Sequence, residues 1–199
     1  MNEFEREELL KEMREENWLD ITKKFDIKKV TKVLEFKECM SLAYDLFFKN
    51  FYDDDIQDFA VRLFFLIRDE YQSNWNDDWK NNVLLGELCG LTWRYNERYE
   101  CYKTAYEQVV DPSDALLLLL AGCNSTPGIP PISDKEAEEF LKKAIEKKVT
   151  YESAIMMRGL YRNKNEKKLE NYWDKMCTEL KEKNIHTETI KPDILSYKF

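Results

Sequence analysis

Apolar residues recur along this chain at helical spacing. Four sets with intervals of four and three residues are Ala60/Phe64/Ile67, Tyr102/Tyr106/Val109, Ala137/Leu141/Ala144 and Leu169/Trp173/Met176. This spacing places the three members of each set on one face of an α-helix. The sets begin 42, 35 and 32 residues apart, an interval typical of helical hairpins stacked one on the next. We therefore predict an all-α fold of stacked antiparallel helical hairpins with about nine helices.

Turn and capping residues divide the chain into these helices. Ser133 with Glu136 three residues later predicts a capping box. Asp111 is predicted to cap the start of the helix that follows it, with Pro112 at the first position of that helix. Helices are predicted at 3–17, 36–51, 56–71, 78–95, 97–109, 115–123, 134–147, 151–161 and 166–183, with a further stretch of helical spacing at 21–34 and a turn at Asn96. We expect one structural domain with an N-terminal helical segment at 1–35, a hairpin array at 36–183 and a C-terminal tail at 184–199.

Three glycines recur within the predicted hairpins. Gly90, Gly122 and Gly159 each fall once in the first helix of a pair. A glycine inside a helix costs about 1 kcal/mol relative to alanine, so its recurrence predicts a packing role. We expect these glycines to allow close approach of neighbouring helices.

The hairpin pattern resembles the tetratricopeptide (TPR) repeat between residues 36 and 183. Ala137, Leu141 and Ala144 match the small–large–small second helix of that family, and Asp111-Pro112 resembles its repeat junction. The resemblance implies a short superhelical array whose first helices line a concave groove for peptides. The matching positions are Leu84, Glu87, Leu91, Arg94, Tyr95, Leu116, Leu119, Ser153, Met156 and Leu160. Core packing is the competing interpretation, and it is favoured for Leu116 and Leu119. Glu87 and Leu91 replace the family's carboxylate-clamp residues, which disfavours an adaptor for chaperone tails.

Aromatic residues gather between positions 75 and 102. The cluster contains Trp75, Trp79, Trp93, Tyr95, Tyr99 and Tyr102, interleaved with Arg94 and Arg98. Aromatic and arginine side chains are enriched in protein–protein hot spots, although core packing is the common alternative. The predicted partner-binding residues are therefore Leu84, Glu87, Leu91, Arg94, Tyr95, Trp79 and Met156.

Charge narrows the choice of partner. The chain has a net charge of −8 and a pI near 5.0. Nucleic-acid binding requires a basic face, so the partner is expected to be a basic protein or peptide, not a nucleic acid. The longest apolar run, 115–121, is too short to span a bilayer, which predicts no membrane partner. Five scattered cysteines and no signal peptide predict a cytoplasmic protein.

The residues of common reaction centres are missing from the sequence. His186 is the sole histidine, and its spacing specifies no acid–base partner. No glycine-rich phosphate loop occurs, and the adjacent aspartates at 53–55 and 77–78 are interpreted as helix starts or solvated loops. We therefore predict a protein that is not an enzyme and that needs no cofactor or metal.

Two functional hypotheses follow. The first is a protein-interaction module whose acidic surface binds a basic partner, such as an immunity protein that neutralises a bacterial toxin, or an adaptor. The second is a regulatory sensor that binds a peptide or small ligand in its concave groove. An enzyme with an all-carboxylate metal site is a third possibility, which would take up Mg²⁺ or Mn²⁺.

Overall fold

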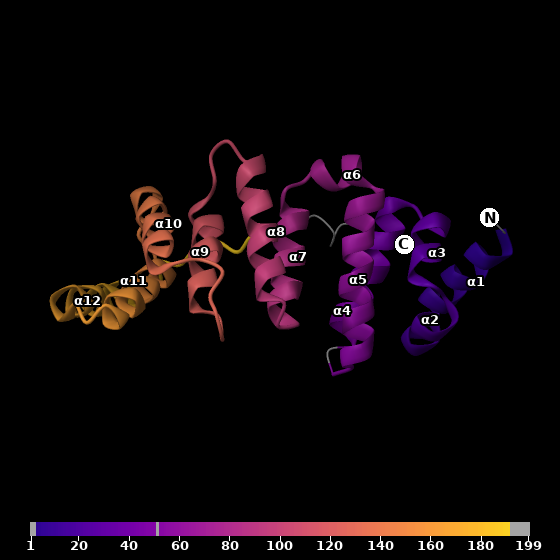
Figure 1. Ribbon diagram of the computed structural model, residues 1–199, viewed down its shortest axis with the longest axis horizontal. Coiled ribbons are helices and arrows are strands. Elements are labelled where there is room, and N and C mark those ends of the chain that lie inside the picture. Colours follow the sequence, from indigo (N-terminus) through magenta and orange to yellow (C-terminus); the bar gives the residue numbers. More distant parts are fainter. Residues whose placement is uncertain (1–2, 51, 192–199) are drawn as a thin grey trace. The chain divides into compact units, whose positions relative to one another are not determined.

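The computed structural model describes residues 3–50 and 52–191 (Figure 1). This part of the chain folds into helices and contains no strand, so the predicted all-α class is confirmed. The predicted number of about nine helices is wrong, because twelve α-helices and one 3-10 turn are present in the described residues. They are α1 (Glu3–Arg14), α2 (Trp18–Lys24), α3 (Ile27–Val33), α4 (Phe36–Lys49), α5 (Asp54–Glu70), α6 (Gln72–Asn76), α7 (Lys80–Leu91), α8 (Tyr95–Gln108), α9 (Asp114–Gly122), η1 (Cys123–Ser125), α10 (Asp134–Lys147), α11 (Tyr151–Asn163) and α12 (Lys167–Glu182).

Local capping explains part of the difference between the predicted and the observed number of helices. The stretch at 21–34 is split into α2 and α3 because Phe25 is extended and the Asp26 carboxylate accepts a hydrogen bond from Lys28 N at 2.8 Å. A side chain that caps a helix competes with continuation of the preceding one. The turn expected at Asn96 lies earlier, at residues 92–94, where Trp93 has a left-handed φ of 62°.

Of the two helix starts predicted from capping residues, one is confirmed and one is wrong. Ser133 and Glu136 form the predicted reciprocal capping box of α10. The prediction for Asp111-Pro112 is wrong, because Ser113 caps α9 by accepting a hydrogen bond from Leu116 N at 3.2 Å. Pro112 therefore precedes the cap and does not occupy the first helical position.

The chain divides into two compact units. Among the described residues, unit 1 contains those up to Thr92 and unit 2 contains those from Trp93 to Lys191. The predicted boundaries at 35/36 and 183/184 fall inside these units. The helix pair predicted at 78–95 and 97–109 is divided between them, since α7 belongs to unit 1 and α8 to unit 2.

Helix α5 is the centre of unit 1. It contacts α2, α3, α4, α6 and α7, and its most extensive packing is against α4 (Figure 1). The predicted face Ala60/Phe64/Ile67 is fully buried. Trp75 of α6 is also fully buried, and its indole N–H donates to Asn82 Oδ1 at 3.0 Å, so the polar group of this core tryptophan is satisfied.

Two pairs of consecutive helices pack closely within unit 2. Helix α9 packs mainly against α10 and α11 packs mainly against α12, while α10 and α11 join the two pairs (Figure 1). The predicted face Ala137/Leu141/Ala144 is buried. The fourth predicted set is buried in part: Trp173 is buried and Met176 is half-buried against the core, but Leu169 is 38% exposed, and the other buried residues of α12 are Glu170, Cys177 and Leu180. Glu170 is accommodated there by ion pairs with Arg162 and Lys167.

Residues that follow α12 are held against the start of α11. Ile185 N donates to Leu180 O, and Ile185 O accepts from Tyr151 N, both at 2.9 Å. His186 Nδ1 lies 2.6 Å from Glu152 Oε1, and Thr187 N donates to Glu152 Oε2 at 2.8 Å. His186 is exposed, and the fold gives it an acidic partner that its spacing in the sequence did not identify. The predicted tail from residue 192 onward lies outside the described residues.

The packing role predicted for the glycines is wrong at the two positions where it can be judged. A Cβ built on Gly122 would lie 3.7 Å from Met156 Cε, an ordinary contact, and one on Gly159 would meet no atom within 4 Å. Gly128 differs because its φ of +84° is a backbone conformation that side chains disfavour.

We expect opposite stability effects from two alanine substitutions. Gly159→Ala should raise the free energy of unfolding by about 1 kcal/mol, because alanine has the better helix propensity and its Cβ has room. Gly128→Ala should lower it by about 1 kcal/mol, because alanine is strained at positive φ. Urea unfolding of both variants checks this, and a loss of stability in Gly159→Ala would contradict the open packing.

An ion-pair network in unit 2 predicts pH-dependent stability. Lys142 lies 2.8 Å from Glu138, and Lys164 also pairs with it, so their hydrogen bonds lower the pKa of Glu138 from 4.5 to about 2. A lowered folded-state pKa stabilises the fold above pH 4.5, and this contribution is lost as the pH falls toward 2. Because solvent screens the lysines, Glu138→Gln should cost only about 1 kcal/mol at pH 7.

Unfolding in urea at pH 7 and near pH 2 measures that difference. The variant and the parent protein should differ at pH 7 and converge at the lower pH. An equal difference at both pH values would show that the effect of Glu138 does not come from its charge.

Candidate functional site

The predicted partner-binding residues are distributed over both units. Trp79, Leu84, Glu87 and Leu91 belong to unit 1, whereas Arg94, Tyr95 and Met156 belong to unit 2. In unit 1, Leu84 is buried and Trp79 is half-buried, while Glu87 and Leu91 are exposed. In unit 2, Arg94, Tyr95 and Met156 are all half-buried. Leu116 and Ser153, which the repeat resemblance also placed in the groove, are fully buried.

The aromatic cluster does not share one environment. Trp75 is fully buried in unit 1, and Tyr102 is fully buried in unit 2. Trp93 is 75% exposed, and its ring meets that of Tyr95 edge-on with centroids 6.1 Å apart. Core packing therefore accounts for two members, whereas Trp93 is available at the surface.

A hollow of about 420 Å³ opens on the surface of unit 1 between the start of α2 and the α4–α5 connection. We call it the acidic hollow because three carboxylates line it together with three apolar side chains and two carboxamides. Its lining residues are Glu16, Asn17, Trp18, Leu19, Asp20, Asn50, Asp53 and Ile56.

Local backbone structure places the three carboxylates. Glu16 has a left-handed φ of 56° in the turn between α1 and α2. Asp20 lies in the first turn of α2 and pairs with Lys24 at 3.0 Å. Asp53 caps α5 by accepting a hydrogen bond from Ile56 N at 3.0 Å. A turn, a helix face and a helix cap thus converge on one opening.

Lys49 shows how the wall of the acidic hollow holds a cation. Its ammonium lies 2.5 Å from Glu16 Oε1, 3.3 Å from Asp45 Oδ2 and 5.2 Å from the centroid of the Trp18 ring. The hydrogen bond to Glu16 is the main reason that the pKa of Lys49 is raised. Carboxylate and indole here combine an ion pair with a cation–π contact, the chemistry that recognises basic side chains.

Exposed apolar and acidic residues occur in the same helices and connection. Leu19 is 48% exposed, Phe48 is 40% exposed and Tyr52 is 99% exposed. Asp54 and Asp55 in the first turn of α5 are exposed, and none of the ion pairs among the described residues involves them. Aromatic side chains next to unpaired carboxylates are suited to a partner that supplies both apolar and basic groups.

The charge of the protein is concentrated in one unit. Residues 1–92 contain 21 Asp and Glu against 13 Lys and Arg, whereas residues 93–191 contain 17 of each. The net charge of −8 therefore falls on the unit that carries the acidic hollow.

Unit 2 has a different opening, of about 330 Å³, between α9–η1, α10 and α11. We call it the apolar hollow because buried aliphatic side chains form its floor and uncharged polar side chains form most of its rim. It is lined by Ala121, Asn124, Ser125, Ala137, Leu141, Ile155, Met156, Gly159, Leu160, Arg162 and Asn163. Of the seven predicted partner-binding residues, Met156 lines it.

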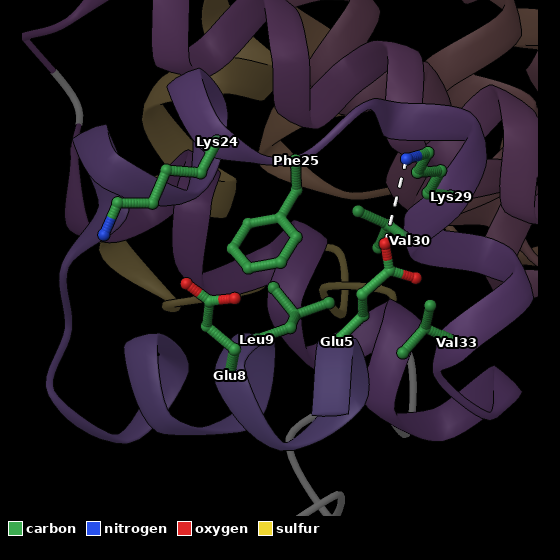
Figure 2. A pocket seen from close by; sticks show the side chains of 8 residues that line it. All are labelled: Glu5, Glu8, Leu9, Lys24, Phe25, Lys29, Val30 and Val33. Atoms are coloured by element: carbon green, nitrogen blue, oxygen red, sulfur yellow. Dashed lines mark ion pairs between the residues drawn. The ribbon is translucent and has the colours of Figure 1, made fainter. Parts of the chain in front are cut away.

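A smaller cleft of about 160 Å³ separates α1 from α2 and α3 (Figure 2). In Figure 2 the Phe25 ring points toward Leu9, and Lys29 pairs with Glu5 at 3.8 Å. Lys24 is paired with Glu12 at 2.7 Å, and its hydrogen bond is the main reason that the pKa of Glu12 is lowered. Because it is less than half the volume of either hollow, this cleft is a weaker candidate.

Metal sites and membrane-spanning helices are absent from the described residues. The described part of the chain contains no group of three or more histidine, cysteine or acidic side chains placed to hold a metal ion. None of its helices combines the length and apolar character that crossing a bilayer requires. All five cysteines are buried. No protein-family model, curated protein or solved structure matches the chain.

Sequence reasoning did not identify either hollow as a site. The aspartates at 53–55 were interpreted as a helix start, which is correct for the Asp53 cap. No periodicity signals that Glu16 and Asp20 lie beside Asp53, because the α1–α2 turn and the α4–α5 connection are more than 30 residues apart. The run of three aspartates that follows the aromatic residue Tyr52 is the sequence signal that could have indicated the acidic hollow.

Proposed function

We propose that this chain is a non-enzymatic protein-interaction module that binds a basic protein through the acidic hollow of unit 1. The observation that carries the proposal is the confinement of the entire net charge to residues 1–92, the unit with three carboxylates around one opening. A partner's lysine or arginine would enter between these carboxylates, and its apolar neighbours would contact Leu19 and Tyr52.

Physical chemistry favours this use of the surface. A strongly acidic face attracts a basic partner over long range and speeds association, an effect that salt screens. Exposed aromatic and aliphatic side chains then supply area to be buried once the partner has docked. An immunity protein that neutralises a basic toxin, or an adaptor, has these requirements. A cytoplasmic location, with neither nucleic acid nor membrane as partner, belongs to the same proposal, and five scattered, buried cysteines support a reducing compartment.

The proposal predicts that specific acids, and not total charge, control binding. The variant Asp20→Asn/Asp54→Asn/Asp55→Asn should retain about tenfold less of the partner in an affinity pull-down from source lysate, read by quantitative mass spectrometry. Its matched control, Glu7→Gln/Glu70→Gln/Asp77→Asn, removes the same charge from other exposed positions of unit 1. The control should retain the partner within about twofold.

The pull-down should be run at low and moderate salt, with thermal unfolding of each variant to confirm folding. A basic protein that leaves as salt rises, and that the first variant alone fails to retain, supports docking at the acidic hollow and the adjacent start of α5. Equal losses in both variants would indicate non-specific charge attraction. Capture that is insensitive to salt and to both variants would overturn the proposal.

The second candidate function is a regulatory sensor that binds a peptide or small ligand. The observation that favours it is the apolar hollow, which opens to solvent beside Met156. A ligand that binds only the folded chain raises its unfolding temperature by mass action. A thermal-shift screen should therefore find ligands whose effect disappears when Gly159→Phe fills the opening.

A further inference from the structure

We propose that the apolar hollow of unit 2 holds one apolar side chain of an extended peptide, of the size of leucine or phenylalanine, while its rim binds the peptide backbone. This inference goes beyond the docking of a basic partner, because it concerns the other unit and a ligand of different chemistry. The inference names a class of ligand for the proposed sensor, and it rests on the sensor proposal alone.

The floor of the apolar hollow is suited to an aliphatic or aromatic group. Ala121, Ala137 and Leu141 are each 2% exposed and present only carbon atoms. The volume of about 330 Å³ exceeds the roughly 150 Å³ that admits benzene in an engineered apolar cavity. A single large side chain can therefore enter, whereas the opening is at the lower limit for a drug-sized molecule.

Gly159 and Met156 keep the wall open and adaptable. A Cβ at Gly159 would have no atom within 4 Å, so the missing side chain contributes directly to the space. Met156 is half-buried beside it, and the flexible thioether can adjust to side chains of different shape. The glycine that the repeat pattern assigned to helix packing thus lies at an unfilled surface.

The rim provides hydrogen-bonding groups that no other described residue uses. Ser125 and Asn163 are exposed, and none of the side-chain hydrogen bonds among the described residues involves them. Asn124 Nδ2 already donates to Ile132 O at 3.2 Å and Asp134 Oδ1 at 3.0 Å, which fixes its carboxamide and leaves its oxygen as an acceptor. Carboxamides both donate and accept, so they match the alternating N–H and C=O groups of a peptide backbone.

The electrostatics of unit 2 select an uncharged occupant. Arg162 is the one charged residue that lines the hollow, and its Nε lies 2.8 Å from Glu170 Oε1. Residues 93–191 carry equal numbers of acidic and basic side chains. A lysine in the hollow would lose its hydration without gaining an unpaired carboxylate, so its burial would be unfavourable. Burial of a phenylalanine would be favourable, because it removes apolar surface from water.

Capped tripeptides test this inference on the full chain. We would titrate acetyl-Ala-Phe-Ala-amide, acetyl-Ala-Ala-Ala-amide and acetyl-Ala-Lys-Ala-amide while recording ¹H–¹⁵N correlation spectra. The phenylalanine peptide should bind about tenfold or more tightly than the other two and shift the amide signals of Asn124, Gly159 and Asn163. Equal shifts from all three peptides, or shifts confined to residues outside the hollow, would overturn the proposal.

Three variants make the outcome decisive. Gly159→Phe should fill the hollow and abolish the shifts, whereas Lys168→Phe adds the same ring to an exposed position of α12 and should not. Asn163→Ala removes a rim carboxamide from an exposed residue, so it should weaken binding about threefold or more without loss of thermal stability. Unchanged binding in both Gly159→Phe and Asn163→Ala would exclude the hollow. Capture of a basic partner should be unaffected by these variants, so failure here leaves the function proposed for unit 1 intact.

Discussion

Burial of one face of α5 is the interaction on which unit 1 depends. Ala60, Phe64 and Ile67 are completely removed from water, and five other helices contact the helix that carries them. Each fully buried large apolar side chain contributes about 2 kcal/mol, so this face outweighs the weak propensities of the short helices around it. The cap that starts α5, Asp53, also lines the acidic hollow, which couples the position of the proposed binding surface to the central packing of the unit.

The two units use the same type of secondary structure for different surfaces. Unit 1 concentrates uncompensated carboxylates, and it holds its own Lys49 with the groups that would recognise a partner's lysine or arginine. Unit 2 compensates its charges internally, as the Glu138 and Glu170 networks show, and leaves an apolar opening. The proposed long-range attraction and the proposed apolar recognition therefore belong to different units, so variants in one unit can be tested without disturbing the chemistry of the other.

Ion pairing also explains how charged residues occupy buried stripes. Glu170 is 7% exposed on the inner face of α12, where Arg162 and Lys167 neutralise it. A periodicity argument that counts only apolar residues passes over such a position and chooses its neighbour Leu169. The exposure of Leu169 in the fourth set follows from that choice, since a paired carboxylate can take an inner position that an unpaired one cannot.

Helical spacing and local capping chemistry, which depend on residues within a few positions of one another, were readable from the sequence alone. They established the all-α class, the buried faces of α5 and α10, and the capping box at Ser133. The breaks at Phe25 and Trp93 depend on extended or left-handed backbone that no periodic pattern encodes. Both hollows were decided by tertiary structure, because each is formed by residues from several elements whose proximity is a long-range property. The pairing of His186 with Glu152, 34 residues earlier, was decided in the same way.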